Sequence, residues 1–329
     1  MRIKWENGIS IEYEESKVVF DFQSRVLNCR ASFVTHAHAD HAYSFRLRQI
    51  PVFSSEETMK LISAHGVKAN RWQPLAINRR VKIDDIEVVP HSSGHILGSY
   101  EFEVHMPDGI VLFTGDLNTR EERLIKPAEP VKCDILIIEA TYGSPEFIFP
   151  SDKDVTEDMI RWAEEVLSKG KIPAFQADAI GNSQEVIRIF NENTGIPVIS
   201  HWKVSMVNKI YGSYGLRIDY IDINSKEASE LISKTDAVIV APKEPSLFSN
   251  DRFALAVVSG WAIKFKRRSF PLSDHADFPS LLEFIKECSP KLVLTYHGGE
   301  HNKILARYIE KKMGVRSYPI NLIPTNFSI

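Results

Sequence analysis

The sequence predicts an α/β fold in which one α/β domain is inserted into another, on the basis of three observations. Residues 1–120 read mostly as short strands. After Ser151 the pattern changes to alternating strands and helices, which is typical of a parallel sheet with crossover helices. Beyond Asp277 a helix is followed by an apolar strand that runs into a histidine. This last segment therefore completes the first domain.

In the first segment, strands are expected at residues 8–14, 17–22, 32–35, 81–90, 100–105 and 110–114. Ser54 and Glu57 form the Ser-x-x-Glu pattern of a capping box, which predicts that a helix begins there. That helix is expected to end near His65, with Gly66 as its C-terminal cap.

The middle segment predicts an α/β lobe inserted between Glu139 and His275. Helices are expected at residues 155–167, 183–191, 204–211 and 226–233, and strands at 172–177, 198–200, 218–223 and 237–241. In the last segment, helices are expected at 280–286 and 304–313, and strands before His297 and at 317–323.

The most informative stretch is residues 35–41, Thr-His-Ala-His-Ala-Asp-His, which follows a short apolar strand. Imidazole and carboxylate are ligands that suit zinc and similar divalent metals. In an extended segment His36 and His38 project to one face, whereas Asp40 and His41 lie past the turn and can face a second point. The stretch therefore predicts ligands for two adjacent metals. A solvated histidine-rich loop is the alternative.

Three other segments carry ligand types at strand ends or tight turns. His95 lies in Gly-His-Ile-Leu-Gly-Ser, Asp116 follows an apolar strand through Thr-Gly, and His297 follows the strand Leu-Val-Leu-Thr-Tyr. Each segment is a weak indication alone, but together they place metal ligands at one end of several strands and so predict a site.

This set of residues resembles the metallo-β-lactamase superfamily, and two further segments resemble its β-CASP nuclease branch. Ile-Ile-Glu-Ala-Thr-Tyr-Gly, residues 137–143, is similar to motif A, with Glu139 as its acid. Ser-Asp-His-Ala-Asp, residues 273–277, is similar to motif B, with His275, and His297 then matches motif C. Asp21 stands where the family keeps an aspartate behind the metal ligands.

The resemblance implies a metallo-β-lactamase αββα sandwich formed by residues 1–144 and 258–329, with a β-CASP domain inserted at 145–257. It implies two divalent ions, with zinc expected and Mn²⁺ as the alternative. His36, His38 and His95 would hold the first ion, Asp40, His41 and His297 the second, and Asp116 would bridge them. Asp40, His275 and Glu139 are the expected catalytic residues, with Glu139 orienting His275. The alternatives are a helix-entry histidine for His275, a strand-end surface acid for Glu139 and a turn-forming residue for Asp21.

Basic residues just before motif B are candidates for nucleic-acid binding: Lys264, Lys266, Arg267 and Arg268, interleaved with Phe265. A charged loop that serves solubility is the alternative. Ser183 opens a helix whose amides could hold a phosphate, and a plain N-cap is the alternative there.

The bulk properties limit where and how the protein acts. The formal net charge of −3 argues against nucleic-acid binding over the whole surface, so such binding needs a local basic patch. Cys29, Cys133 and Cys288 are scattered, which fits a reduced, cytoplasmic location. We expect single-stranded RNA or DNA as partner and no membrane span, and a homodimer stays open.

The function expected is that of a metal-dependent nuclease, endo- or exonucleolytic, on single-stranded nucleic acid. RNA processing is favoured, because a histidine at motif C is usual in RNA-processing relatives and an aliphatic residue in Artemis-like DNA-repair relatives. The compact length also resembles bacterial exonucleases associated with DNA ligase, so DNA repair is the alternative. Motifs A and B and the inserted domain argue against a small-molecule hydrolase, and the intact ligand set argues against a non-catalytic subunit.

Overall fold

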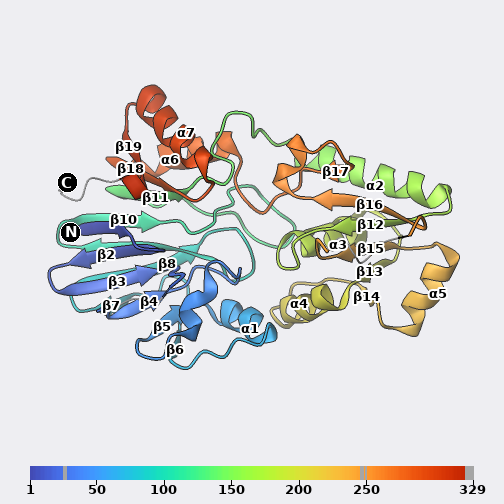
Figure 1. Ribbon diagram of the computed structural model, residues 1–329, viewed down its shortest axis with the longest axis horizontal. Helices are drawn as coiled ribbons and strands as arrows, with labels where there is room; N and C mark the ends of the chain where they lie inside the picture. The colour runs from blue at the N-terminus through green and yellow to red at the C-terminus, as the bar shows by residue number, and fades with distance from the viewer. Residues whose placement is uncertain (25–27, 245–247, 249, 323–329) are drawn as a thin grey trace. The chain divides into compact units, whose positions relative to one another are not determined.

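The computed structural model describes residues 1–24, 28–244, 248 and 250–322. The chain divides into two compact units. Unit 1 comprises Met1–Glu121, Ile125–Ile148 and His275–Ile329, and unit 2 comprises Glu122–Leu124 and Phe149–Asp274. The predicted α/β fold with an inserted α/β lobe is confirmed (Figure 1).

Unit 1 contains two β-sheets. The first has strands in the order β1 (Arg2–Trp5), β2 (Ile9–Tyr13), β3 (Ser16–Phe20), β4 (Ala31–Phe33), β5 (Val52–Ser54) and β6 (Trp72–Pro74). The second has the order β19 (Arg316–Pro319), β18 (Leu292–Tyr296), β11 (Ile135–Glu139), β10 (Gly109–Phe113), β9 (Tyr100–Met106), β8 (Ile86–Ser92) and β7 (Val81–Ile83). The helices are α1 (Glu56–Ala64), α6 (Phe278–Cys288) and α7 (Glu300–Tyr308), with shorter helical turns η1 (Ala42–Arg46), η3 (Ile309–Met313) and η4 (Ile320–Leu322).

The two sheets of unit 1 pack face to face around an aromatic core. Phe20 of β3 stacks on Phe33 of β4 at a centroid distance of 5.2 Å. Phe20 also contacts Phe102 and Phe113 of the opposite sheet, each at 5.5 Å. Aromatic pairs at such separations add to the stabilisation from buried area. This core holds the two sheets together.

Helices α6 and α7 cover the outer face of the second sheet (Figure 1). Their apolar residues, among them Leu281, Ile285 and Leu305, pack with Leu136 and Val293 of β11 and β18. Successive side chains of a strand point to opposite faces of the sheet. The second sheet therefore contributes both to the aromatic core between the sheets and to the core beneath α6 and α7. The layers of unit 1 are those expected of the αββα sandwich.

Unit 2 is built on one parallel sheet. Its strands lie in the order β14 (Ile221–Asp222), β13 (Val198–Ser200), β15 (Val238–Ala241), β12 (Ile172–Gln176), β16 (Phe253–Val258) and β17 (Ser269–Phe270). The helices are α2 (Asp152–Ser168), α3 (Asn182–Asn193), α4 (Trp202–Ser213) and α5 (Lys226–Lys234), with a short turn η2 (Gly260–Lys264). Apolar clusters lie on both faces of the sheet, as is typical when crossover helices cover both faces.

The observed elements differ from the expected ones in three places. The strand expected at 81–90 is a hairpin of β7 and β8, because Asp84 adopts a left-handed conformation with φ of 52° and reverses the chain. The cap of α1 is Ser55 rather than Ser54: the Ser55 hydroxyl accepts the Thr58 amide at 3.0 Å. The insertion was expected to end at residue 257, whereas β17 pairs in parallel with β16 and unit 2 extends to Asp274.

Arg123 fixes the short excursion Glu122–Leu124 within unit 2. Its guanidinium donates to both carboxylate oxygens of Asp152, at 2.9 and 2.6 Å, and to the Thr156 hydroxyl at 2.8 Å. The buried Glu185 carboxylate accepts the amides of Arg123 and Leu124, at 3.3 and 3.0 Å. Burial, opposed by Arg123, raises the pKa of Glu185 to about 7.

Candidate metal centre

The candidate ligands of unit 1 lie at the carboxyl ends of parallel strands. Strands β3 and β4 are parallel neighbours, and so are β10, β11 and β18. Carboxyl ends of parallel neighbours meet at one edge of a sheet, which is where ligands bind in α/β folds. Asp21 follows β3, His36 and His38 follow β4, and Asp116 follows β10. Glu139 ends β11, and His297 follows β18.

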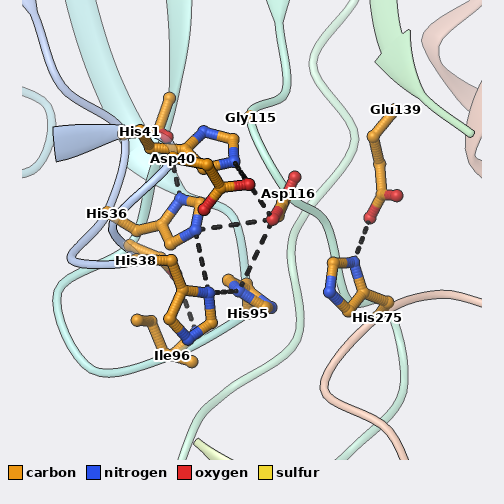
Figure 2. Close-up of polar contacts among 12 residues, drawn as sticks. His36, His38, Asp40, His41, His95, Ile96, Gly115, Asp116, Glu139 and His275 are labelled. Carbon is orange, nitrogen blue, oxygen red and sulfur yellow. Dashed lines mark hydrogen bonds and ion pairs between the residues drawn. The ribbon is translucent and has the colours of Figure 1, made fainter. Parts of the chain in front are cut away.

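One group of ligand atoms comes from His36, His38, His95 and Asp116. The Nε2 atoms of His36 and His95 lie 3.1 and 3.2 Å from Nδ1 of His38. The three rings are mutually edge-on, with interplanar angles from 76° to 85°. Figure 2 shows the three imidazoles pointing toward one another. Three nitrogens converging at this spacing suit one tetrahedral metal.

A second group comes from Asp40, His41 and His297. Nε2 of His41 lies 3.5 Å from an Asp40 oxygen, and Nε2 of His297 lies 3.7 Å from the same carboxylate. Asp40 is exposed, whereas His41 is buried. The structure thus brings together each of the seven residues predicted as ligands.

Asp116 lies between the two groups. Its carboxylate oxygens are 3.4 Å from His36 Nε2, 3.5 Å from His41 Nε2 and 3.4 Å from His297 Nδ1. A carboxylate has two oxygens and several lone pairs, so one side chain can serve two cations. This position is the one that a bridging ligand requires.

Asp21 lies behind His41. Its Oδ2 atom is 2.8 Å from His41 Nδ1 and accepts the Thr35 hydroxyl at 2.6 Å, while Oδ1 accepts the Thr35 amide at 2.8 Å. The Thr35 hydroxyl also lies 2.9 Å from Nδ1 of His36. A hydrogen bond on one ring nitrogen fixes the tautomer and leaves the other nitrogen for a metal.

The residues present fit a divalent metal on two grounds. Within the described residues, His41 Nε2, Asp116 Oδ1 and His297 Nδ1 are buried without a hydrogen-bond partner. Such atoms are costly to bury unless something binds them. The donor set of imidazoles and carboxylates is also that of zinc and manganese sites.

The electrostatics of the cluster point the same way. Burial, reinforced by the nearby His41, holds the pKa of His36 well below its usual value, so this ring is neutral. Burial also opposes a charge on His41, but the Asp116 and Asp21 carboxylates raise the pKa of His41 to about 10. A metal cation would replace that proton, because metal binding and protonation compete for the same nitrogen.

His275 and Glu139 form a pair beside the ligands (Figure 2). His275 Nδ1 lies 2.8 Å from Glu139 Oε1, and the His275 ring is 4.5 Å from the His95 ring. Glu139 is fully buried. Burial raises the pKa of Glu139, but the His275 ring and its hydrogen bond outweigh this and leave that pKa lowered. The carboxylate is therefore ionised and accepts from the imidazole.

Backbone amides hold this pair in place. Sequence reasoning missed them, because every residue except proline has an amide and nothing in the sequence marks these ones. The Leu117 amide donates to Glu139 Oε1 and the Thr141 amide to Oε2, each at 3.0 Å. The Ala276 amide donates to the Leu117 carbonyl at 2.7 Å. The loop after β10 thereby connects the acid to the histidine.

Two glycines permit the close approach of these loops. Gly94, before His95, has φ of 72°, and a Cβ there would lie 2.2 Å from the Asn118 carbonyl oxygen. Gly298, after His297, has φ of 69°, and a Cβ would lie 1.9 Å from the Ala140 carbonyl oxygen. Any side chain would push His95 or His297 out of the cluster.

The basic residues expected to bind nucleic acid, Lys264, Lys266, Arg267 and Arg268, are all exposed but differ in their contacts. Arg267 lies over the Phe265 ring at 5.2 Å. Arg268 lies 4.5 Å from the centroid of Phe270 and donates to Asp158 at 3.1 Å, so it contacts two other elements of unit 2.

Ser183 is buried, and the amides at the start of α3 already donate within the protein. Its own amide donates to the Asp178 carbonyl, and those of Gln184 and Glu185 donate to the Gly181 carbonyl. This geometry does not favour a phosphate at α3. The helix cap is Gly181, and Ser183 lies beyond it.

Two family models match the sequence. A beta-lactamase superfamily domain matches residues 23–174, and a Zn-dependent metallo-hydrolase RNA specificity domain matches residues 260–320. The first match covers the ligands from His36 to Asp116 and the acid Glu139, and the second covers His275 and His297. The chain belongs to the metallo-β-lactamase superfamily, in its β-CASP branch.

Curated relatives of this metallo-β-lactamase protein include enzymes named for both RNA and DNA. An RNase aCSPSF2 of Saccharolobus solfataricus is 26% identical over 94% of this chain and 77% of its own length. A probable DNA ligase of Opitutus terrae is 28% identical over 82% of this chain, which spans only 27% of the ligase. An RNase J-like protein of Methanocaldococcus jannaschii is 27% identical over 66% of this chain and 59% of its own length.

A solved structure shares the fold of this metallo-β-lactamase protein. A protein of unknown function from Enterococcus faecalis superposes with a TM-score of 0.63 over 88% of this chain and 90% of its own, at 14% identity. At this identity the likeness shows a shared fold and nothing about the chemistry of the site.

Proposed function

We propose that the protein is a metal-dependent nuclease that hydrolyses phosphodiester bonds in single-stranded nucleic acid, with RNA as the favoured substrate. The observation that carries the proposal is the position of Asp116. Its carboxylate lies within 3.5 Å of nitrogens from both ligand groups, at His36, His41 and His297. Paired metal sites of this kind are typical of enzymes that displace an oxygen from a phosphodiester.

The proposed site holds two ions, zinc before manganese. His36, His38 and His95 would hold one, Asp40, His41 and His297 the other, and Asp116 both. When bound, such ions act as Lewis acids toward phosphoryl oxygens and lower the pKa of water. The Zn-dependent description of the family model that matches residues 260–320 supports zinc.

The protein's own residues supply the proton chemistry. Glu139 accepts from Nδ1 of His275 and so stabilises the protonated imidazole, which leaves Nε2 to donate to the departing 3′-oxygen. Glu139 itself is held by the amides of Leu117 and Thr141, so the pair needs little reorganisation during the reaction. Exposed Asp40 at the solvent side of the cluster is the carboxylate proposed to orient the attacking water.

The choice of RNA rests on His297 and on the relatives named as ribonucleases. The 28% identity with the probable DNA ligase keeps a DNA-repair exonuclease as the second candidate. The exposed residues Lys264, Lys266 and Arg267 are proposed to contact phosphates of either substrate.

A reducing, cytoplasmic location is proposed because the three cysteines are free and buried. None of the helices in the described ranges has the length and apolar content needed to cross a bilayer. For the assembly of the protein we propose a homodimer, and sedimentation analysis would test it.

Digestion of RNA and DNA strands of one sequence, labelled at either end, tests the function directly. We expect metal-dependent cleavage of RNA, and the product lengths distinguish endo- from exonucleolytic action and give its polarity. Faster cleavage of DNA would support the repair candidate. Absence of cleavage of both by a protein shown to contain metal would refute the proposal.

A further inference from the structure

The carboxyl edge of the sheet in unit 2 carries side chains that the metal centre does not use. All described pairings in this sheet are parallel, so the residues after β12, β13 and β15 emerge at the same edge. Ligands of open α/β sheets bind outside this edge. The residues there are Asp178 after β12, His201, Trp202 and Lys203 after β13, and Lys243 and Glu244 after β15.

Trp202, the first residue of α4, keeps 44% of its surface exposed. The residue before it is anchored in the protein. The His201 ring lies 5.6 Å from the Trp202 ring at an interplanar angle of 40°, and His201 is itself buried, with its amide donating to the Val240 carbonyl at 2.9 Å. A large aromatic ring that is open to solvent beside an anchored residue is suited to stacking.

One cationic side chain contacts this ring, and a second lies on the neighbouring connection at the same edge of the sheet. The Lys203 ammonium lies 5.6 Å from the Trp202 centroid and pairs with Glu244. Lys243 pairs with Asp178 at 2.6 Å on the neighbouring connection. Both lysine side chains are more than one third exposed, and exposed ion pairs contribute little, so a phosphate can compete for either ammonium.

We propose that Trp202 is a stacking platform for a base of single-stranded nucleic acid, with Lys203 and Lys243 contacting the adjoining phosphates. Aromatic stacking accepts any base, so the platform would retain strands without reading their sequence. This proposal rests on the proposed nuclease function, because it assigns a binding role for the same substrate.

The test is binding of a fluorescein-labelled, phosphorothioate-linked RNA oligomer, which resists hydrolysis, followed by fluorescence anisotropy on the metal-loaded protein. Trp202→Ala is expected to raise Kd roughly ten- to a hundredfold, and Trp202→Phe to stay within about threefold of the wild type. Trp5→Ala is the matched control, because Trp5 in unit 1 is 39% exposed and should leave Kd unchanged. Lys203→Ala and Lys243→Ala should each lower the salt dependence of binding, by ~0.7 in the log–log slope per lost phosphate contact.

Hydrolysis of bis(p-nitrophenyl) phosphate, a small diester without a nucleobase, separates the two proposals. Unchanged hydrolysis together with weakened RNA binding in Trp202→Ala would support the platform. Wild-type Kd in Trp202→Ala, or equal losses in Trp202→Ala and Trp5→Ala, would overturn it. If the wild-type protein cleaves neither RNA nor the diester, the nuclease proposal fails while the binding measurement still decides on Trp202.

Discussion

His275 Nδ1 lies 2.8 Å from Oε1 of Glu139, a carboxylate with no exposed surface. The same oxygen accepts the Leu117 amide, and the other oxygen accepts the Thr141 amide. A buried carboxylate that is fully hydrogen-bonded stays ionised and fixes the orientation of its partner. The two residues are far apart in the chain: Glu139 ends β11, and His275 lies just before α6.

Replacing His275 with alanine should lower turnover of a diester by about 10²–10⁴-fold, the usual contribution of a positioned acid or base. Metal content should stay near that of the wild type, because seven other residues supply the proposed ligands. Steady-state kinetics and elemental analysis of the same sample check both expectations. Loss of metal from the variant would make His275 a ligand instead.

Glu139→Gln should reduce turnover in the same direction but by less, because Glu139 acts through the His275 imidazole. The double variant should lose little more than His275→Ala alone, as for residues that act as a unit. Additive losses would show that the two side chains act separately.

Asp21→Asn should weaken metal binding by about 10–100-fold, the usual effect of losing a hydrogen-bonded carboxylate behind a ligand. The Asp21 carboxylate is 2.8 Å from His41 Nδ1 and helps to raise the pKa of that ring. Competition with a fluorescent zinc chelator measures the affinity. Asp108→Asn, at an exposed carboxylate, is the control and should bind metal as the wild type does.

Removal of metal should also lower stability. A ligand that binds only the folded state stabilises it by about 2.7 kcal/mol at a hundredfold excess over Kd. We therefore expect Tm to fall on chelation and to rise again with added zinc. In the His38→Ala variant, which lacks one ligand, the rise should be smaller. An equal rise in this variant would exclude the first ligand group as the stabilising site.

The sequence indicated which side chains would lie together, because metal binding demands particular side chains and parallel strands bring their carboxyl ends together; that these side chains bind metal stays a prediction. His36 and Asp116, far apart in the chain, lie 3.4 Å apart for that reason. It could not predict the amides that hold Glu139, since any residue provides one. It also gave Arg268 the same role as its neighbours, because the partner Asp158 is distant in sequence and only the fold brings the two together.

Substitutions in the basic cluster of Lys264, Lys266, Arg267 and Arg268 should therefore have two different effects. Arg268→Ala should destabilise unit 2, because it removes the contact with Phe270 and the pair with Asp158. Lys264→Ala, Lys266→Ala and Arg267→Ala should leave Tm unchanged and instead weaken RNA binding at low salt. Calorimetry and salt-dependent anisotropy check these outcomes. A Tm loss in the Lys264, Lys266 and Arg267 variants that equals the loss in Arg268→Ala would contradict this difference in roles.

Glu101 of β9, which is not among the candidate metal ligands, should make the stability of the protein depend on pH. It is fully buried, and neither carboxylate oxygen has a hydrogen-bond partner within the described residues. Burial, with the nearby Cys288 and Glu103 adding to it, holds the pKa of Glu101 well above its ordinary value of 4.5. A raised folded-state pKa gives stability that is complete below pH 4.5 and is lost as pH rises toward the folded value.

Glu101→Gln removes this pH dependence because an amide does not titrate. The advantage of the variant over the wild type should therefore grow with pH, by about 1.4 kcal/mol per pH unit between the unfolded and folded pKa values. Guanidinium unfolding at pH 5 and pH 8 measures the difference. Glu129→Gln, at an exposed carboxylate in the connection between β10 and β11, is the matched control and should show the same small effect at both pH values. A Glu101→Gln difference that does not change between pH 5 and pH 8 would mean that Glu101 is ionised in the folded protein, and the burial argument would then be wrong.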